Sequence, residues 1–144
     1  MRDSINYGKV NPDFQRALVD TSRTVSTIDP QLKALLEVRV SQLNGCAYCL
    51  DMHAHEARQL GVPQQRLDCL VAWHESGLFD DAERAALAWA DGLTTLDGDL
   101  EDRFEELASH FDEDEVVDIT LTVSLMNTWN RIGVGFALQP RQRR

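Results

Sequence analysis

Two cysteines and a histidine close together in the sequence are the residues best suited to chemistry. Cys46 and Cys49 form a Cys-x-x-Cys pair, and His53 follows Cys49 by four residues. On a helix that begins near Gly45 these three side chains share one face, because residues three and four apart are neighbours on a helical surface. The first-turn N–H groups and the helix dipole stabilise a thiolate there, and a nearby imidazole adds a proton acceptor or a positive charge. The spacing therefore indicates a redox site with a nucleophilic thiol, a second thiol that can close a disulfide, and a base.

The same residues allow two other hypotheses, a zinc site and a purely structural role. A zinc site would use the cysteine pair, His53 and His55, but two residues correspond to about 200° around a helix, so His55 should point away. A tetrahedral site would then need an outside ligand such as His74 or His110. In the structural hypothesis the two cysteines and the histidine belong to the core, because free cysteine is commonly buried as a small hydrophobe. Cys69, in an apolar segment, is predicted to be such a buried thiol.

Composition and charge set limits on the fold and on the partners. The chain has 144 residues, of which 43% are hydrophobic and 26% charged, as expected for one soluble globular domain over 1–144 with a core at about 12–138. Its net charge of −10 repels phosphate backbones and anionic lipids, so no nucleic acid or membrane partner is expected. Without a stretch resembling a signal peptide or a membrane span, we expect a cytoplasmic protein. In that reducing compartment three cysteines do not make a disulfide framework, which favours catalytic thiols or metal ligands.

Helix signals recur along the chain and strand signals do not, which predicts an all-α, single-domain bundle of about six to seven helices. Asn11-Pro12 and Asp29-Pro30 combine a capping residue with a proline at the first helical position. The expected helices cover residues 12–25, 30–44, 46–61, 63–77 and 80–92, a short segment after Asp99, and residues 112–136. The last helix has more apolar positions than one face needs, which fits either a central core helix or an oligomer interface.

The residues around the cysteine pair also carry a family resemblance. Residues 38–53 read VRVSQLNGCAYCLDMH and include the motif Asn-Gly-Cys-x-x-Cys-x-x-x-His. This block resembles the alkylhydroperoxidase AhpD-like, carboxymuconolactone decarboxylase family, and the similarity continues through residues 56–58, 83–90 and 127–131. The motif is typical of the thiol-active branch, because the decarboxylase branch lacks the cysteine pair. The resemblance implies an all-helical fold and a homo-oligomer, commonly a trimer or hexamer.

The resemblance further implies antioxidant activity, namely a peroxiredoxin-type alkylhydroperoxidase or disulfide oxidoreductase. By position, Cys49 would attack the hydroperoxide, Cys46 would be the resolving thiol, and His53 would belong to the proton relay that activates Cys49. The sulfenic acid formed on Cys49 would condense with Cys46 to a disulfide. A dithiol reductant such as a lipoyl or thioredoxin-type carrier would then reduce that disulfide. No cofactor and no metal are expected.

Two positions depart from the family's pattern. The relay glutamate lies twelve residues before the first cysteine in the best-described members, and here that position is Ala34. Glu37 lies one helical turn later and is our candidate for the relay carboxylate, unless it is a solvated surface charge. Tyr48 replaces a histidine found between the cysteines in some members, and its hydroxyl can bond a peroxide or thiolate unless the ring only packs.

Two alternative functions remain at this point. A lyase resembling carboxymuconolactone decarboxylase would act on a small lactone acid, but the cysteine pair and the lack of a basic cluster for a carboxylated substrate argue against it. A non-enzymatic redox sensor would use the same dithiol to alter contacts between subunits. Turnover with a dithiol reductant separates the peroxidase from the sensor, and insensitivity to Cys→Ser replacement would favour the lyase.

Overall fold

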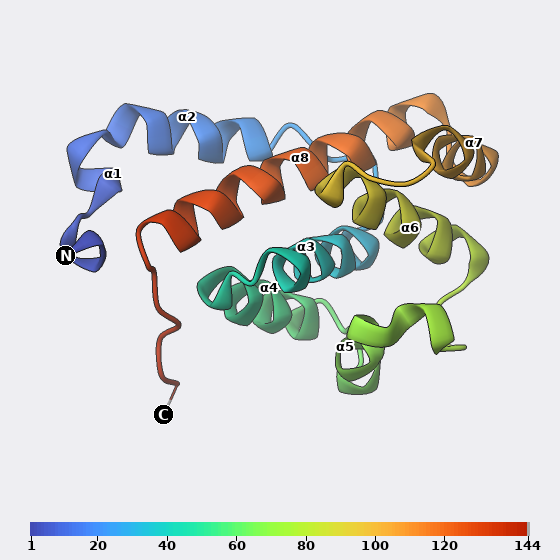
Figure 1. Ribbon diagram of the computed structural model, residues 1–144, viewed down its shortest axis with the longest axis horizontal. Helices are drawn as coiled ribbons and strands as arrows, with labels where there is room; N and C mark the ends of the chain where they lie inside the picture. Colours follow the sequence, from blue (N-terminus) through green and yellow to red (C-terminus); the bar gives the residue numbers. More distant parts are fainter. Residues whose placement is uncertain (144) are drawn as a thin grey trace.

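The regular structure of the chain is helical. The computed structural model describes residues 1–143 and has no strand in that range (Figure 1). The elements are η1 (Arg2–Ser4), α1 (Tyr7–Val10), α2 (Pro12–Ser22), α3 (Pro30–Asn44), α4 (Ala47–Gln59), α5 (Gln64–Cys69), η2 (Leu70–Glu75), α6 (Asp81–Thr95), α7 (Leu100–His110) and α8 (Glu113–Gly135). The predicted all-α class is confirmed. None of the helices in the described part of the chain is long and apolar enough to span a membrane.

Side-chain caps begin the helices where the sequence predicts. The Asn11 side chain accepts a hydrogen bond from the N–H of Phe14 at the start of α2, and the Asp29 side chain does the same for Leu32 in α3. Asp80 and Asp112 each form a complete capping box with the glutamate three residues later. Each cap satisfies N–H groups that the first helical turn leaves free.

Helix α3 lies at the centre of the bundle and positions the site. It packs against α4, α6 and α8, and Figure 1 shows α8 running alongside α3. Leu35, Leu36 and Val40 of α3 are fully buried, as are Ile119 and Val123 of α8. Because α3 is covered on several sides, its apolar residues surround the helix instead of forming one stripe.

Helix α2 ends earlier than the sequence predicts. The apolar spacing extends this helix to Val25, whereas α2 ends at Ser22. The side chain of Asp118, on α8, accepts hydrogen bonds from the N–H groups of Ser26 (3.0 Å) and Thr27 (2.9 Å). These bonds to a distant helix replace the helical ones, and no local pattern announces them.

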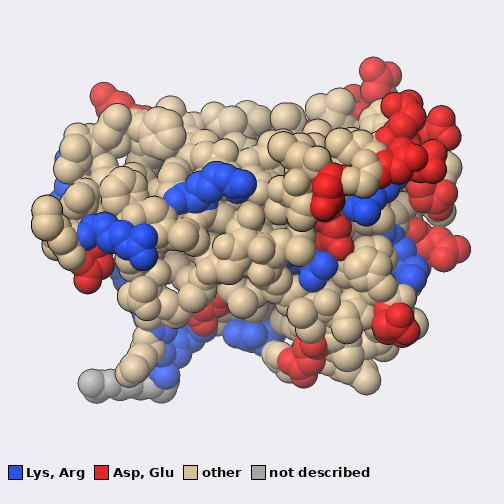
Figure 2. Space-filling model, viewed as in Figure 1, with Lys and Arg blue, Asp and Glu red and all other residues tan. Residues whose placement is uncertain are grey.

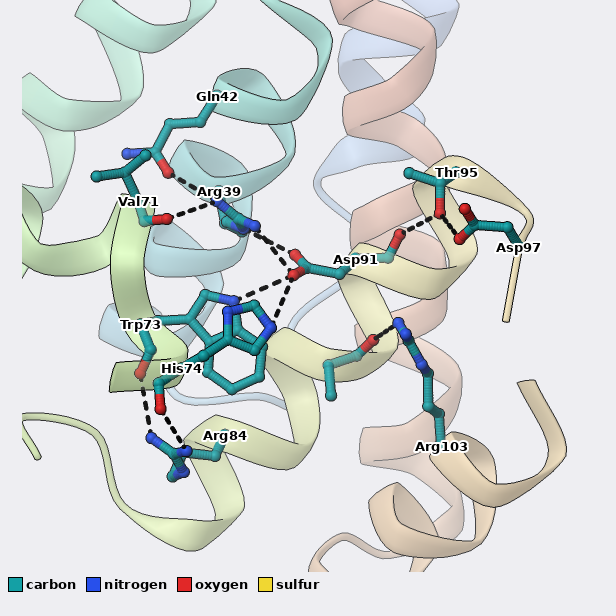
Figure 3. A network of polar contacts seen from close by, with 11 residues as sticks. Arg39, Gln42, Val71, Trp73, His74, Arg84, Asp91, Thr95, Asp97 and Arg103 are labelled. Carbon is teal, nitrogen blue, oxygen red and sulfur yellow. Dashed lines mark hydrogen bonds and ion pairs between the residues drawn. The ribbon is translucent and has the colours of Figure 1, made fainter. Parts of the chain in front are cut away.

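The single helix expected over 63–77 is interrupted. The chain leaves α5 for the 3₁₀ helix η2, and Ala72 has non-helical angles (φ −117°, ψ 36°). The guanidinium of Arg84, on α6, donates to the carbonyl groups of Trp73 and His74, both at 3.1 Å (Figure 3). These contacts give the carbonyl groups partners from outside the helix, so the segment turns instead of continuing.

Helix α6 continues past Gly92, where the sequence predicts its end, and reaches Thr95. Gly92 is buried, and a Cβ atom there would lie 2.6 Å from Nη1 of Arg103. That guanidinium donates to the carbonyl of Ala88 at 2.8 Å (Figure 3). The glycine therefore makes room for a side chain of α7 and does not end the helix.

A buried ion pair connects α3 to α6 and η2. Arg39 binds Asp91 through two parallel bonds, Nε to Oδ1 at 2.7 Å and Nη2 to Oδ2 at 3.0 Å (Figure 3). The indole N–H of Trp73 donates to the same carboxylate at 3.1 Å. Paired guanidinium and carboxylate groups of this kind hold their helices in one register.

We expect Arg39→Met to lower the free energy of unfolding by about 3 kcal/mol, because Asp91 would keep a buried charge without its main partner. Arg23→Met is the control, since Arg23 pairs with Asp20 on the exposed surface and such pairs contribute at most about 1 kcal/mol. Urea unfolding measures both. Equal effects of the two substitutions would show that the buried pair has no special role in stability.

Candidate active site

The cysteine pair lies at the turn between α3 and α4. Gly45 ends α3 in the left-handed conformation (φ 65°, ψ 33°), which glycine adopts without a steric penalty. Cys46 is the N-cap of α4, and its sulfur accepts a hydrogen bond from the N–H of Cys49 at 3.3 Å. Cys46 and Cys49 are joined by a disulfide, with their Cα atoms 5.3 Å apart. The predicted dithiol can therefore close across the first turn of a helix.

Helix α8 covers the two sulfur atoms. A Cβ atom at Gly133 would lie 2.7 Å from the sulfur of Cys46 and 3.3 Å from that of Cys49. The sulfur of Cys49 also lies 3.9 Å from the carbonyl oxygen of Trp129. Because Gly133 has no side chain, it leaves space for both sulfur atoms.

We expect Gly133→Ala to lower the free energy of unfolding by about 1–3 kcal/mol and to slow closure of the disulfide, because the methyl group must displace a sulfur. Gly135→Ala is the matched control on the same helix, since a Cβ atom there meets nothing within 4 Å. Urea unfolding and the rate of thiol loss during oxidation test this pair of variants. If both alanine variants lose their thiols as fast as the wild-type protein, the close approach of α8 does not affect closure of the disulfide.

His53 lies between two carboxylates. Its Nδ1 atom is 3.2 Å from Oε2 of Glu37 and 3.0 Å from Oε2 of Glu56. Glu37 thus reaches the histidine from α3, while Ala34 is buried and offers no carboxylate. Glu56 was not among the predicted site residues, although its spacing of three residues after His53 was the available signal.

The two glutamates have opposite electrostatic environments. Burial raises the pKa of Glu37 above its ordinary value, although the charges of His53 and Lys33 act in the other direction. The hydrogen bond from His53 holds the pKa of Glu56 below its ordinary value. The sequence prediction that Glu37 is part of the site is therefore compatible with its position, and Glu56 joins it there.

The site opens into a pocket of about 890 Å³ formed by α2, α3, α4, α8 and the first residues of the chain. Apolar side chains line much of the wall, among them Met52, Met126 and Trp129. Of the two cysteines, Cys49 lines the pocket, together with half-buried Tyr48. The polar part of the wall includes His53, Glu37 and Glu56.

The acidic surface lies away from this pocket. Figure 2 shows Asp and Glu side chains gathered at one end of the molecule, over α7 and the start of α8. That end includes the acidic first turn of α8 from Glu113 to Glu115. Gly133 lies twenty residues further along the same helix, which corresponds to about 30 Å. The excess negative charge therefore does not surround the cysteines.

The structure does not bring together the ligands of the alternative zinc site. The sulfurs of the cysteine pair are bonded to each other, and the ring of His74 stacks on Trp73 with centroids 3.7 Å apart. His110 lies against Glu106 at 3.1 Å. The donor atoms that could hold a metal ion in the described residues are those of Glu37, His53 and Glu56, within 4.8 Å of one another.

The third cysteine, Cys69, is less buried than the sequence predicts. Cys69 was expected to be buried, but it is half-buried at the end of α5. The core-facing positions of this segment are Leu67, Leu70 and Trp73, which are buried, and Cys69 lies beside them.

Comparison with known proteins identifies the family. The sequence model of the carboxymuconolactone decarboxylase family matches residues 12–92. This match includes α2 to α4 and thus the cysteine pair and His53. The chain belongs to the carboxymuconolactone decarboxylase family, in its AhpD-like form with a cysteine pair.

Individual relatives extend the similarity over nearly the whole chain. The uncharacterized protein YdfG of Bacillus subtilis (strain 168) is 33% identical over 138 residues, covering 93% of this chain and 94% of YdfG. ATU0492 from Agrobacterium tumefaciens, a protein of unknown function described as a candidate antioxidant defence protein AhpD, is 38% identical to this chain and has a crystal structure. It superimposes with a TM-score of 0.93 over 96% of this chain and 98% of that one. The debrominase Bmp8 is 25% identical, with a TM-score of 0.82 over 92% of this chain and 74% of its own.

Proposed function

We propose that the protein is a thiol-dependent peroxidase that reduces organic hydroperoxides with Cys46 and Cys49. The observation that carries this proposal is the placement of a disulfide-forming pair at a helix N-terminus, with Cys49 in the wall of a pocket that also contains His53. Helix N-termini and nearby imidazoles favour the thiolate, which is the reactive form of cysteine.

The reaction would proceed in three steps. The Cys49 thiolate attacks one oxygen of the hydroperoxide, the O–O bond breaks, and the leaving alkoxide takes the proton that His53 received from the thiol. Cys49 is then a sulfenic acid, and Cys46 attacks its sulfur so that the disulfide forms and water leaves. A cellular dithiol, such as a lipoyl or thioredoxin-type carrier, then reduces the disulfide by thiol–disulfide exchange.

The positions of the two sulfurs favour Cys49 as the attacking atom. Cys49 contributes to the pocket wall, whereas Cys46 lies behind it and closest to the backbone of Gly133. The sulfur of Cys46 also accepts a hydrogen bond from the N–H of Cys49, which keeps it beside Cys49. This arrangement suits Cys46 for the resolving step.

The nature of the pocket supports an organic substrate. Its apolar wall and its volume of about 890 Å³ exceed what hydrogen peroxide requires. The description of ATU0492 as a candidate AhpD antioxidant protein agrees with this proposal. Because the debrominase Bmp8 shares the fold, the fold alone does not determine the reaction, and the proposal depends on the dithiol.

Steady-state peroxide consumption tests the proposed function. The reduced protein would be mixed with cumene hydroperoxide and an excess of dihydrolipoamide, and loss of hydroperoxide would be followed over many equivalents. We expect sustained turnover that stops when either cysteine of the pair is alkylated. One equivalent of reaction without turnover would support a redox sensor instead, and no reaction would refute the peroxidase.

A further inference from the structure

Two carboxylates compete for a single nitrogen atom of His53. An imidazole Nδ1 carries at most one proton, so it donates to one acceptor at a time. The contact with Oε2 of Glu56 at 3.0 Å has the geometry of a hydrogen bond. Oε2 of Glu37 lies at 3.2 Å, within ion-pair distance of the same atom. When Nδ1 carries a proton, the geometry therefore makes Glu56 the acceptor of its hydrogen bond.

The surroundings of the two glutamates favour the same choice. The Glu37 side chain is 17% exposed and that of Glu56 52%, so an ionised Glu37 loses more hydration than an ionised Glu56. Lys33 acts on both carboxylates, and His55 acts on Glu56 as well. The carboxylate at the solvent side is therefore the one that more easily keeps its charge.

We propose that Glu56 is the positioning carboxylate of His53, whereas the sequence suggested Glu37 as the relay carboxylate. The inference rests on the proposed function, because it concerns the histidine that activates Cys49. With its Nδ1 proton donated to Glu56, the imidazole keeps Nε2 free to accept the thiol proton, as in the acid–histidine pairs of hydrolases. The imidazolium formed then lies between two carboxylates and passes its proton to the leaving alkoxide. Glu56 itself takes no proton.

The helical arrangement makes Glu56 a well-fixed partner. His53 and Glu56 are three residues apart on α4, so one helix sets their separation. Glu37 reaches the site from α3, and its position depends on the packing of two helices. A partner on the same helix holds the ring even when the α3–α4 contact relaxes.

Alkylation of Cys49 tests the inference without any peroxide. In a Cys46→Ser background, we would measure the rate of Cys49 alkylation by iodoacetamide at pH 7. We expect Glu56→Gln to lower this rate about tenfold, as losses of partners that orient histidines often do, and Glu56→Asp to restore part of it. Glu37→Gln should have the smaller effect, and Glu105→Gln on the exposed surface of α7 is the control.

The pH profile separates a specific role from a general disturbance. Burial is the main cause of the raised pKa of Glu37, and the charge of Glu56 acts in the same direction. Glu56→Gln should therefore move any part of the profile that is due to Glu37 toward lower pH. Lys33 acts in the opposite direction on Glu37 and remains in every variant, as do Asp3 and Arg141 at the pocket wall. A merely structural loss would lower the rate at all pH values without this displacement.

Nitrogen-15 spectra of the imidazole provide the decisive outcome. We expect the proton of neutral His53 to be on Nδ1 in the unmodified protein and to be distributed over both nitrogens in Glu56→Gln. If Glu37→Gln causes the larger fall in alkylation, or if Glu56→Gln leaves both the tautomer and the rate unchanged, the inference is wrong. The predicted alkylation pattern without peroxide turnover would refute the proposed function and leave the assignment of Glu56 intact.

Discussion

Replacing Cys49 by serine is expected to abolish peroxide consumption. A serine hydroxyl is not ionised near neutral pH, so the pocket would lose its nucleophile. Cys46→Ser should behave differently, because Cys49 would still attack one hydroperoxide and then stop as a sulfenic acid. Hydroperoxide loss and trapping of the sulfenic acid with dimedone measure the two variants.

Cys69→Ser serves as the control for the loss of a thiol. Cys69 lies at the end of α5, outside the pocket, and should leave turnover unchanged. If Cys49→Ser retained turnover while Cys46→Ser lost it, the two cysteines would have to exchange roles. If both variants kept full activity, the reaction would not use the dithiol.

Replacing His53 by glutamine is expected to lower the rate of the reaction between Cys49 and an organic hydroperoxide by about 10²-fold. Glutamine still forms hydrogen bonds but neither accepts the thiol proton nor returns it to the alkoxide. Stopped-flow measurement of the first oxidation step isolates this effect from the reduction of the disulfide.

The effect of His53 should decrease as the pH rises. Hydroxide progressively supplies the thiolate without a base, so the ratio between the unmodified protein and His53→Gln should become smaller in alkaline solution. His110→Gln, at the C-terminal end of α7, is the control and should leave the rate unchanged. A ratio near one at neutral pH would exclude His53 from the activation of Cys49.

The parts of the fold that were predictable from sequence depend on local physics. A capping side chain such as Asn11 or Asp29 acts on N–H groups two or three residues away, and both caps are present where predicted. The spacing of Cys46, Cys49 and His53 likewise places the two cysteines at the start of α4, and Cys49 and His53 both line the pocket. Such signals lie within one helical turn, so a single sequence contains them.

The features that were missed depend on contacts between distant segments. The sequence predicts a helix end near Gly92, but Gly92 makes room for Arg103, and Gly133 of α8 makes room for the sulfur atoms. The break in η2 depends on Arg84, which donates hydrogen bonds to carbonyl groups of that segment. Glu56 is the exception, because its spacing of three residues from His53 is a local signal that the sequence contains.

Titration of the reduced protein with an organic hydroperoxide tests the central claim most directly. After each addition the remaining thiols would be alkylated, and peptide mass mapping would assign every cysteine. The account predicts rapid loss of two thiols for each hydroperoxide consumed, a disulfide between Cys46 and Cys49, and an unmodified Cys69. Slow reaction of all three cysteines, at the rate of ordinary free thiols, would contradict it.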